Sequence, residues 1–550
     1  MLVGGGPRNL WSPLICLGVL LIFFGSATHA FVMSPIRKLF APSTPPASSP
    51  SASSTVSGSP SPGSVRKSLS ARFRFSGSRR GGKGTSKATS AEDDSDQASV
   101  SFSMVGFPGS PSISTRVDDD DDDDDGLDGD QEESYGAEQQ RPSSLPTTQE
   151  VLATFPARDF QPSPWTTNEH WQTIWGARAV QDIILQKVAP KTLPQGWQDV
   201  YDRRERWETP DGDFFHVDYL LYDTRPPAPS SAPRPLVIVL HGLESTSWAL
   251  LPRSMAKAYV RRGFDVLALN FRGCSGVDNL KPYSYHLGFT DDLAYVLRRL
   301  HAEDPRRRVY LTGFSLGGNV ILKCLGELGE EAARLGVEGA AVACVPFDAV
   351  RSSSKIDTGF NRWVYAGNFL KTLKVKAAQK WEKHRESLDG EELGEGPYDL
   401  ERVLACSRIG DFDDEVIAKL HNFEGKVDYY TQSCSKQYLP RIRIPALVVN
   451  ARDDPFINEK GLPTPEEVGE GTVRLVYHKH GGHCGFLTGQ EEKGGLEEER
   501  WLPTELARFL EHVDVPFRAL EGGEESDGVS RVVTGDRQST LAAKWAKRER

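Results

Sequence analysis

The sequence predicts a doubly wound α/β fold, with a mostly parallel sheet, an inserted and mainly helical cap, and a disordered N-terminal region. Three observations lead to this prediction: short apolar runs, amphipathic stretches between them, and one long interval that interrupts the alternation. Short and nearly continuous apolar runs are typical of strands buried on both faces of a parallel sheet. Six such runs lie at 236–240, 265–269, 309–312, 340–344, 446–449 and 473–477.

Amphipathic stretches separate these runs and predict the crossover helices that join parallel strands. Ahead of the parallel set, residues 214–222 alternate between polar and apolar side chains directly after Asp211–Gly212–Asp213. That pattern predicts an antiparallel hairpin at the edge of the sheet. The predicted crossover helices lie at 252–262, 291–301, 319–328 and 502–512.

An inserted cap is predicted at residues 348–440, which separate two strands that a single helix would normally join. Helical patterns occur within it at 364–381 and 413–422. Because the insertion follows one parallel strand and precedes the next, we expect it over the carboxyl edge of the sheet. The α/β core is then split into residues 156–347 and 441–515.

The segments on either side of the core have the composition of disordered chain. Residues 31–91 are basic, rich in Ser and Pro and free of acidic residues, whereas residues 92–155 include eight consecutive aspartates at 118–125. Such a block repels itself and predicts a solvated acidic linker. Residues 516–550 predict a disordered tail. The folded part has no Lys/Arg stripe with interleaved aromatic residues, so nucleic-acid binding is not expected.

The first thirty residues predict a signal peptide or a signal anchor. An apolar run at 14–24 follows Arg8 and precedes the small-residue pattern 27–30. The run is shorter than the roughly 20 residues of a membrane-spanning helix, which favours cleavage. Because the segment behind Phe31 has the composition of a transit peptide, the two parts together predict plastid import through the endomembrane system. An endomembrane-anchored or secreted protein is the alternative.

A nucleophile elbow is predicted at residues 313–317, which read Gly-Phe-Ser-Leu-Gly. The predicted strand 309–312 runs into this G-x-S-x-G motif, and a helical pattern begins at Asn319. Glycine is needed at 313 and 317, two residues before and two residues after the serine, because any side chain there would collide with the neighbouring strand or helix. Ser315 is therefore the candidate nucleophile.

A serine hydroxyl needs a general base and an acid that orients the base, which on this kind of sheet follow in chain order Ser, Asp/Glu, His. Asp454 and His483 follow the last two predicted strands, and we assign them as acid and base. Three glycines close to His483 favour it, since they free the backbone of its loop. Asp453 is the alternative acid, and His480 and His478 are the alternative bases.

The oxyanion of an acyl-transfer reaction requires two backbone donors. The amide of Leu316 follows the nucleophile, and the amide of Leu243 or Glu244 follows a His-Gly turn at the end of the first parallel strand. His241 is expected to brace this turn. The seven cysteines are widely spaced and form no pattern of metal ligands, so no metal, disulfide framework or organic cofactor is expected.

Several motifs together give a family resemblance that extends from about residue 160 to residue 510. The sequence is similar to the α/β-hydrolase family of YheT-like and embryogenesis-associated proteins. The most discriminating segment is Asn270–Gly276, which reads NFRGCSG. The other segments are 168–174, 204–205, 211–213, 241–244, 285–288, 290–293, 313–319, 412–413, 428–430, 453–455 and 481–486.

This resemblance implies an α/β-hydrolase fold and a serine hydrolase, with the triad carried onto Ser315, Asp454 and His483. It also implies carboxylesterase and acylglycerol or phospholipid lipase activities, and a possible membrane association. We therefore expect hydrolysis of carboxylic esters, with a small-molecule ester or lipid as substrate. The alternatives are an acyltransferase or an aminopeptidase-type peptidase on the same triad, or a non-catalytic ligand-binding scaffold.

Overall fold

The computed structural model describes residues 144–164, 166–176, 200–223, 232–385, 396–469, 471–488 and 500–521. The predicted signal segment 1–30, the basic segment 31–91 and the acidic linker up to residue 143 lie outside the described residues. The predicted strands, the helical parts of the insertion and all candidate site residues lie within them.

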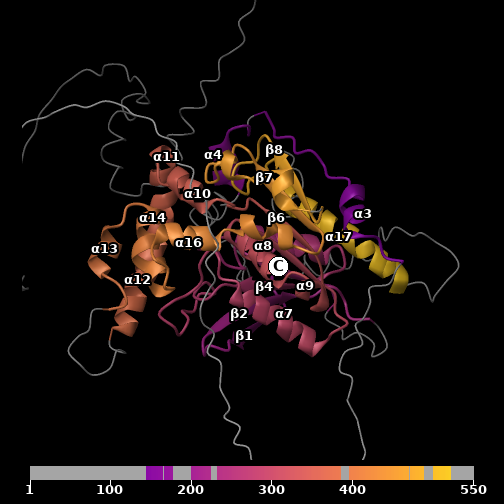
Figure 1. Cartoon of the computed structure of the whole chain (residues 1–550), viewed down its shortest axis with the longest axis horizontal. Helices are drawn as coiled ribbons and strands as arrows, with labels where there is room; N and C mark the ends of the chain where they lie inside the picture. Colours follow the sequence, from indigo (N-terminus) through magenta and orange to yellow (C-terminus); the bar gives the residue numbers. More distant parts are fainter. Residues whose placement is uncertain are drawn as a thin grey trace, which may run out of the picture. The chain divides into compact units, whose positions relative to one another are not determined.

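An eight-stranded sheet has the order β1-β2-β4-β3-β5-β6-β7-β8, and Figure 1 shows helices packed around it. The β1–β2 hairpin is antiparallel and joins β4, whereas the pairs from β4 to β8 are parallel. The predicted parallel sheet with an antiparallel edge hairpin is thus confirmed. Its strands are β1 (Arg203–Glu208), β2 (Phe214–Leu220), β3 (Leu236–Leu240), β4 (Asp265–Asn270), β5 (Val309–Phe314), β6 (Val337–Ala343), β7 (Ala446–Ala451) and β8 (Val473–His478).

The central strands are apolar along almost their whole length because helices cover both faces of the sheet. Every residue of β3, β4, β5 and β7 is buried, whereas four of the six residues of the edge strand β8 are only half-buried. Burial on both faces removes the alternation seen in one-sided sheets. The parallel strands could therefore be recognised from continuous apolar runs rather than from alternation.

The crossover helices form where the sequence predicts them. Helix α6 (Leu250–Val260) packs with α17 (Trp501–Glu521) on one face of the sheet, and α7 (Asp291–Glu303) packs with α8 (Leu316–Leu328) on the other. A short helix, α9 (Glu331–Arg334), leads into β6. The loops at the carboxyl ends of the parallel strands then meet at one edge, where the site described below is built.

The predicted linker 92–155 is too long at its C-terminal end. Helix α3 (Thr148–Thr154) closes this segment, and Thr147 and Glu150 form its capping box, with the Thr147 amide donating to Glu150 Oε2 at 2.7 Å. Behind the helix, the ring of Phe155 is buried against α17. The average composition of the acidic segment hid a T-x-x-E capping signal, which satisfies the free amides of a first helical turn.

The predicted tail 516–550 also begins too early, because α17 continues to Glu521. Its last turns are held by a buried carboxylate at Asp514, which accepts hydrogen bonds from Arg308 Nε at 2.9 Å and from the Tyr310 hydroxyl at 2.7 Å. Arg518, one turn later, also pairs with Asp514. These contacts reach back to β5, so the local composition of the tail does not reveal them.

The insertion between β6 and β7 is helical, as predicted, and Figure 1 shows its helices gathered beside the sheet. Two of its helices contain a π-helical turn, at 362–366 and 413–417. The elements are α10 (Ala349–Ile356), α11 (Gly359–Asn361), η2 (Arg362–Ala366), α12 (Gly367–His384), α13 (Leu400–Ala405), α14 (Ile409–Phe412), η3 (Asp413–Ile417), α15 (Ala418–Leu420), α16 (Lys426–Ser433) and η4 (Ser435–Arg441).

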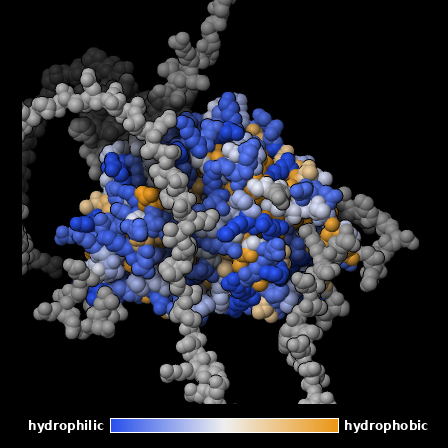
Figure 2. Space-filling model, in the orientation of Figure 1, coloured by the Kyte–Doolittle hydropathy of each residue, from blue (hydrophilic) through white to orange (hydrophobic). Residues whose placement is uncertain are grey.

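The described surface is mostly hydrophilic on the face drawn in Figure 2, with apolar residues scattered among charged ones. Within the described ranges, no helix combines the length and the apolar character that a membrane crossing requires.

We expect Asp514→Asn to lower the free energy of unfolding by about 3 kcal/mol, because it leaves the buried Arg308 guanidinium without this counter-ion. Urea denaturation followed by circular dichroism measures the change. Glu511→Gln is the matched control, since its ion pair with Arg262 is partly exposed and is expected to contribute less than about 1 kcal/mol. Equal losses in the two variants would contradict the proposed anchoring of α17.

Candidate active site

Ser315 lies in the tight turn between β5 and α8. Its backbone has φ 54° and ψ −125°, a conformation that side chains other than glycine rarely adopt. A Cβ atom on Gly317 would lie 2.5 Å from the carbonyl oxygen of His241, and one on Gly313 would lie 3.0 Å from that of Leu240. The two glycines of the motif therefore let the turn pack directly against the end of β3.

The structure brings Ser315, His483 and Asp454 together in one chain of hydrogen bonds. His483 Nε2 is 3.0 Å from Ser315 Oγ, and His483 Nδ1 is 2.7 Å from Asp454 Oδ2. Asp454 is fully buried and His483 nearly so. With the carboxylate ionised, Nδ1 carries the proton and Nε2 is free to accept the hydrogen of the serine hydroxyl.

The Asp454 carboxylate is fixed by its own loop. Its Oδ1 accepts hydrogen bonds from the amides of Phe456 at 2.7 Å and Ile457 at 3.2 Å. The ring of Phe456 also lies against the imidazole of His483, with the centroids 4.2 Å apart. The loop after β7 therefore orients the imidazole of His483 through Asp454 and packs against it through Phe456.

The histidine loop is held by a helix near the start of the folded part. The amide of His483 donates to Thr173 Oγ1 at 2.8 Å, and Thr173 belongs to α4 (Glu169–Gly176). A Cβ on Gly482 or on Gly485 would lie within 2.6 Å of a carbonyl oxygen of α4. Gly482 has φ 57°, a backbone conformation that favours glycine, which agrees with the expected freedom of this loop. Gly485 is needed only because of the close approach to α4.

The alternative acid and bases lie in other contacts. Asp453 Oδ2 is 3.1 Å from His480 Nδ1, and its Oδ1 accepts the amide of Gly482 at 2.9 Å. His478 accepts the amide of Phe160 at 3.3 Å. Asp453 thus stabilises the loop that carries His483, whereas Asp454 contacts the imidazole itself.

The charge of Asp454 acts on the protonation of His483. Burial alone lowers the pKa of the imidazole, but the adjacent Asp454 carboxylate, together with Cys484, outweighs burial and raises the pKa above its usual value. An imidazolium that forms at His483 is therefore stabilised by a fixed and buried counter-ion.

The amides of Leu243 and Glu244, the two candidate oxyanion donors in the turn after β3, differ in their contacts. The amide of Glu244 donates to the Tyr285 hydroxyl at 2.8 Å, so this donor is occupied and Leu243 is the better candidate. The turn lies against the nucleophile, because a Cβ on Gly242 would be 3.3 Å from that of Ser315. Leu316 is the first residue of α8, where backbone amides lack partners within the helix.

His241 braces this turn, as the sequence predicts. Its ring accepts the amide of Phe271 at 3.2 Å through Nε2, and Nδ1 lies 2.8 Å from the carbonyl oxygen of Gly242. Burial lowers the pKa of His241 to about 4, so the ring is neutral and Nδ1–H donates to that carbonyl.

Two buried thiols beside His483 were not anticipated from the sequence. One nitrogen of His483 and the sulfur atoms of Cys344 and Cys484 all lie within 4.8 Å of one another, and the Cys484 amide donates to Cys344 Sγ at 3.2 Å. Such donors suit a soft metal ion, but both nitrogens of His483 already face Ser315 and Asp454. The two cysteines are 140 positions apart, so ligand spacing in the sequence could not reveal the cluster.

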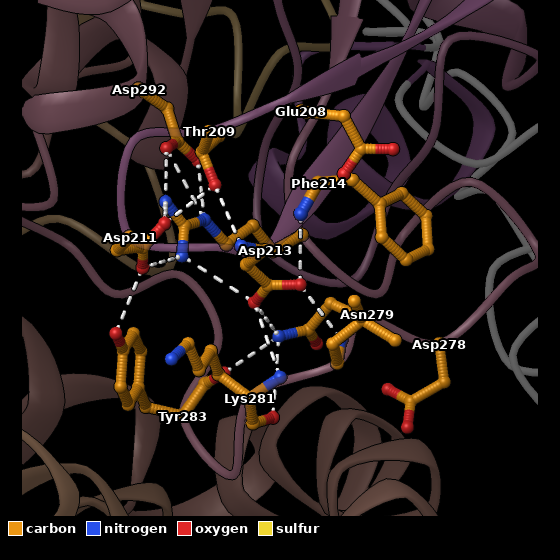
Figure 3. A network of polar contacts seen from close by, with 12 residues as sticks. Glu208, Thr209, Asp211, Asp213, Phe214, Asp278, Asn279, Lys281, Tyr283 and Asp292 are labelled. Atoms are coloured by element: carbon orange, nitrogen blue, oxygen red, sulfur yellow. Dashed lines mark hydrogen bonds and ion pairs between the residues drawn. The ribbon is translucent and has the colours of Figure 1, made fainter.

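The segment 270–276 supplies a scaffold rather than a reacting group. The guanidinium of Arg272 lies among Asp211, Asp213 and Asp292, with its shortest contacts at 2.6 Å to Asp211 and Asp292. Figure 3 shows this network reaching the loop that contains Asn279. The charged core of this motif thus ties the β1–β2 hairpin to the start of α7.

The fold and the elbow geometry define a protein of the α/β-hydrolase class, and comparison with known sequences agrees. A family model described as an alpha/beta hydrolase fold matches residues 235–490. The chain is 34% identical to the esterase-named protein YheT of Escherichia coli (strain K12) over 306 residues, which cover 56% of this chain and 84% of YheT.

Two mammalian relatives are more distant. Phospholipase ABHD3 of Bos taurus is 25% identical over 64% of this chain and 80% of its own length. Monoacylglycerol lipase ABHD2 of Mus musculus is 27% identical over 46% of this chain and 60% of its own length.

The chain belongs to the α/β-hydrolase family of YheT-like and embryogenesis-associated proteins.

We expect Asp454→Asn to lower the pKa of His483, because it removes the carboxylate that stabilises the imidazolium. The measurement is an NMR pH titration of the imidazole resonances, with His483→Gln used to assign the signal. Asp453→Asn is the matched control, since Asp453 contacts His480 and not His483. A fall of the same size in both variants would contradict the assignment of Asp454.

Proposed function

We propose that the protein is a serine hydrolase that cleaves carboxylic esters, those of lipids or acylglycerols in particular, through an acyl-enzyme. The observation that carries the proposal is the hydrogen-bond chain from Ser315 through His483 to Asp454. The names of the relatives, an esterase, a phospholipase and a monoacylglycerol lipase, support the same reaction class.

In the first half-reaction, Ser315 Oγ attacks the ester carbonyl carbon while His483 Nε2 accepts the hydroxyl proton. The amides of Leu243 and Leu316 donate to the oxyanion of the tetrahedral intermediate. His483 then returns the proton to the leaving alcohol. Asp454 keeps the imidazole oriented and stabilises its charge throughout.

In the second half-reaction, water takes the place of the alcohol. His483 removes a proton from the water as it attacks the acyl carbon, and returns that proton to Ser315 Oγ when the acid leaves. Each step uses groups that the chain supplies, and none requires a group from outside the protein other than the ester and water.

A cluster of aromatic rings beside His483 supports the proposal that the acyl group of the substrate is apolar. The ring of Phe456, which lies on His483, also contacts Tyr365 of the cap with centroids 4.7 Å apart, and Phe369 at 6.1 Å. Tyr365 also contacts Phe360, which is exposed. Apolar surface of this kind binds hydrocarbon better than it binds a charged or peptide-like group.

We expect Ser315→Ala and His483→Ala to abolish fluorophosphonate labelling and to lower kcat for p-nitrophenyl esters on the order of 10⁴-fold or more. The thermal unfolding temperature is expected to stay close to that of the wild type. Ser354→Ala, on the exposed side of α10, is the matched serine control. The measurements are gel-based labelling with peptide mapping, and initial rates over a series of acyl chain lengths.

Retained hydrolysis in Ser315→Ala would refute the assignment of the nucleophile. A folded wild-type protein that neither reacts with the probe nor hydrolyses any ester would favour a ligand-binding scaffold. Faster cleavage of peptide anilides than of esters would favour a peptidase.

For the location of this activity, we propose the plastid, on the composition of residues 1–91 alone. A fluorescent protein fused behind residues 1–91 is expected to enter the plastid of an alga whose plastid lies inside the endomembrane system. Fused behind residues 31–91, it is expected to stay outside. Fluorescence confined to the secretory pathway with the longer segment would contradict this proposal.

A further inference from the structure

Three lysines on one face of the cap helix α12 reach the loops of the core. Lys376, Lys380 and Lys383 are separated by four and three positions, which places them on the same side of the helix. Lys380 Nζ donates to the carbonyl oxygen of Lys281 at 2.8 Å, and Lys383 Nζ donates to that of Asn279 at 2.7 Å. These two lysines anchor the cap on one loop of the core.

The anchoring loop is itself held firmly from within the core. Asp213, which is fully buried, accepts the side-chain amide of Asn279 at 2.6 Å and the backbone amide of Leu280 at 2.7 Å. Figure 3 shows Asp213 pointing toward this loop beside the aspartates that surround Arg272. Lys380 and Lys383 therefore bind carbonyl groups whose positions are fixed.

Lys376 makes a different contact, because its partner is a nearly buried carboxylate in the turn that holds the candidate oxyanion donor, whereas the carboxylate beside Lys380 and Lys383 is that of Asp278, which is 43% exposed. Its Nζ is 2.8 Å from Glu244 Oε1, and the side chain of Glu244 is only 5% exposed. The hydroxyl of Tyr285 donates to the same Oε1 at 3.1 Å and accepts the Glu244 amide at 2.8 Å. Glu244 is thus held on one side by the core and on the other by the cap.

The backbone of this turn depends on those contacts. The Ser245 amide donates to the Gly242 carbonyl at 3.2 Å, so that Leu243 and Glu244 are the two central residues of the turn. Glu244 has φ 53°, which costs a residue with a Cβ atom about 1 kcal/mol and persists only where surrounding contacts impose it. Holding Glu244 in this conformation fixes the neighbouring Leu243 amide.

Charge gives the pair a second effect. A nearly buried carboxylate one residue from an oxyanion donor would oppose the negative charge that develops on the substrate. Burial alone lowers the pKa of Lys376, but Cys274 and Glu244 together raise it above its usual value, so the ammonium stays protonated. Its positive charge offsets that of the carboxylate.

We propose that Lys376 and Glu244 are positioning residues that couple the seating of the cap to the oxyanion-binding turn. The turn is competent for catalysis when α12 lies against the core and Lys376 contacts Glu244. This inference rests on the proposed serine hydrolysis and adds to it a requirement for one cap residue outside the triad.

The test compares Lys376→Met with Lys380→Met, which removes a cap anchor of the same length and charge that does not reach Glu244. The measurements are kcat and KM for a short p-nitrophenyl ester, the rate of fluorophosphonate labelling and the thermal unfolding temperature. We expect Lys376→Met to lower kcat and the labelling rate roughly 10- to 100-fold, less than or equal to the loss of a whole oxyanion donor. KM is expected to change less than about twofold, because substrate binding is not involved.

Two further variants separate positioning from general destabilisation. Lys376→Arg keeps the charge and is expected to recover most of the lost kcat. The double variant Lys376→Met with Glu244→Gln removes the unpaired carboxylate, and is expected to be more active than Lys376→Met alone and to fold even if the single variant does not. Lys380→Met is expected to retain kcat within about twofold of the wild type, whatever its thermal stability.

Equal kcat values for Lys376→Met and Lys380→Met would overturn this inference while leaving the proposed function intact. The same conclusion would follow if Lys376→Arg or the double variant gave no recovery. A wild-type protein whose Ser315 does not react with the probe and that hydrolyses no ester would instead overturn the proposed function, and this inference with it.

Discussion

The constraint on which the site depends is the close approach of the turn at Ser315 to the end of β3. The serine adopts its unusual backbone conformation because the chain turns directly from β5 into α8. Gly317 has no side chain, so the carbonyl oxygens at the end of β3 can approach this turn closely. Both neighbours of β5 in the sheet run parallel to it. The turn therefore emerges at the same edge of the sheet where the loops that carry Asp454 and His483 begin. The sheet thereby fixes three side chains that are up to 168 positions apart in the sequence.

The second feature of the molecule is that its buried carboxylates join segments that are distant in the sequence. Asp514 joins the last helix to β5 through Arg308, and Asp292 joins α7 to the loop after β4 through Arg272. Glu244 joins the early turn to the cap in the same way. Because an unpaired buried charge costs several kcal/mol, each of these pairs forbids alternative arrangements of the two segments that it joins. Such pairs fix geometry more than they add net stability, and geometry is what a hydrolytic site requires.

Much of the fold and the order of the site residues could be predicted from local patterns. Continuous apolar runs identify strands buried on two faces, and a glycine-flanked serine between a strand and a helix identifies the elbow. Local patterns left Asp453 open as an alternative to the assigned Asp454, because adjacent residues leave the same strand end and only the path of the loop decides which one contacts His483. The cluster of Cys344 and Cys484 and the contact of Lys376 with Glu244 are similarly invisible, since they join residues from different loops or helices. Helix α3 was missed for another reason: the capping box at Thr147 lies within a segment whose average composition indicates disorder.

The three lysines of α12 illustrate how similar contacts can have unequal consequences. Lys380 and Lys383 donate to backbone carbonyl groups and also pair with Asp278, whose side chain is 43% exposed and can be solvated if the cap moves away. Lys376 neutralises a carboxylate whose side chain is only 5% exposed in the paired state. Its departure therefore leaves an uncompensated charge in a turn of strained backbone, and the cost falls on the turn rather than on the cap. Under the inference drawn above, the cap is thus linked to the oxyanion-binding turn through Lys376, whereas Lys380 and Lys383 serve to hold the cap in place.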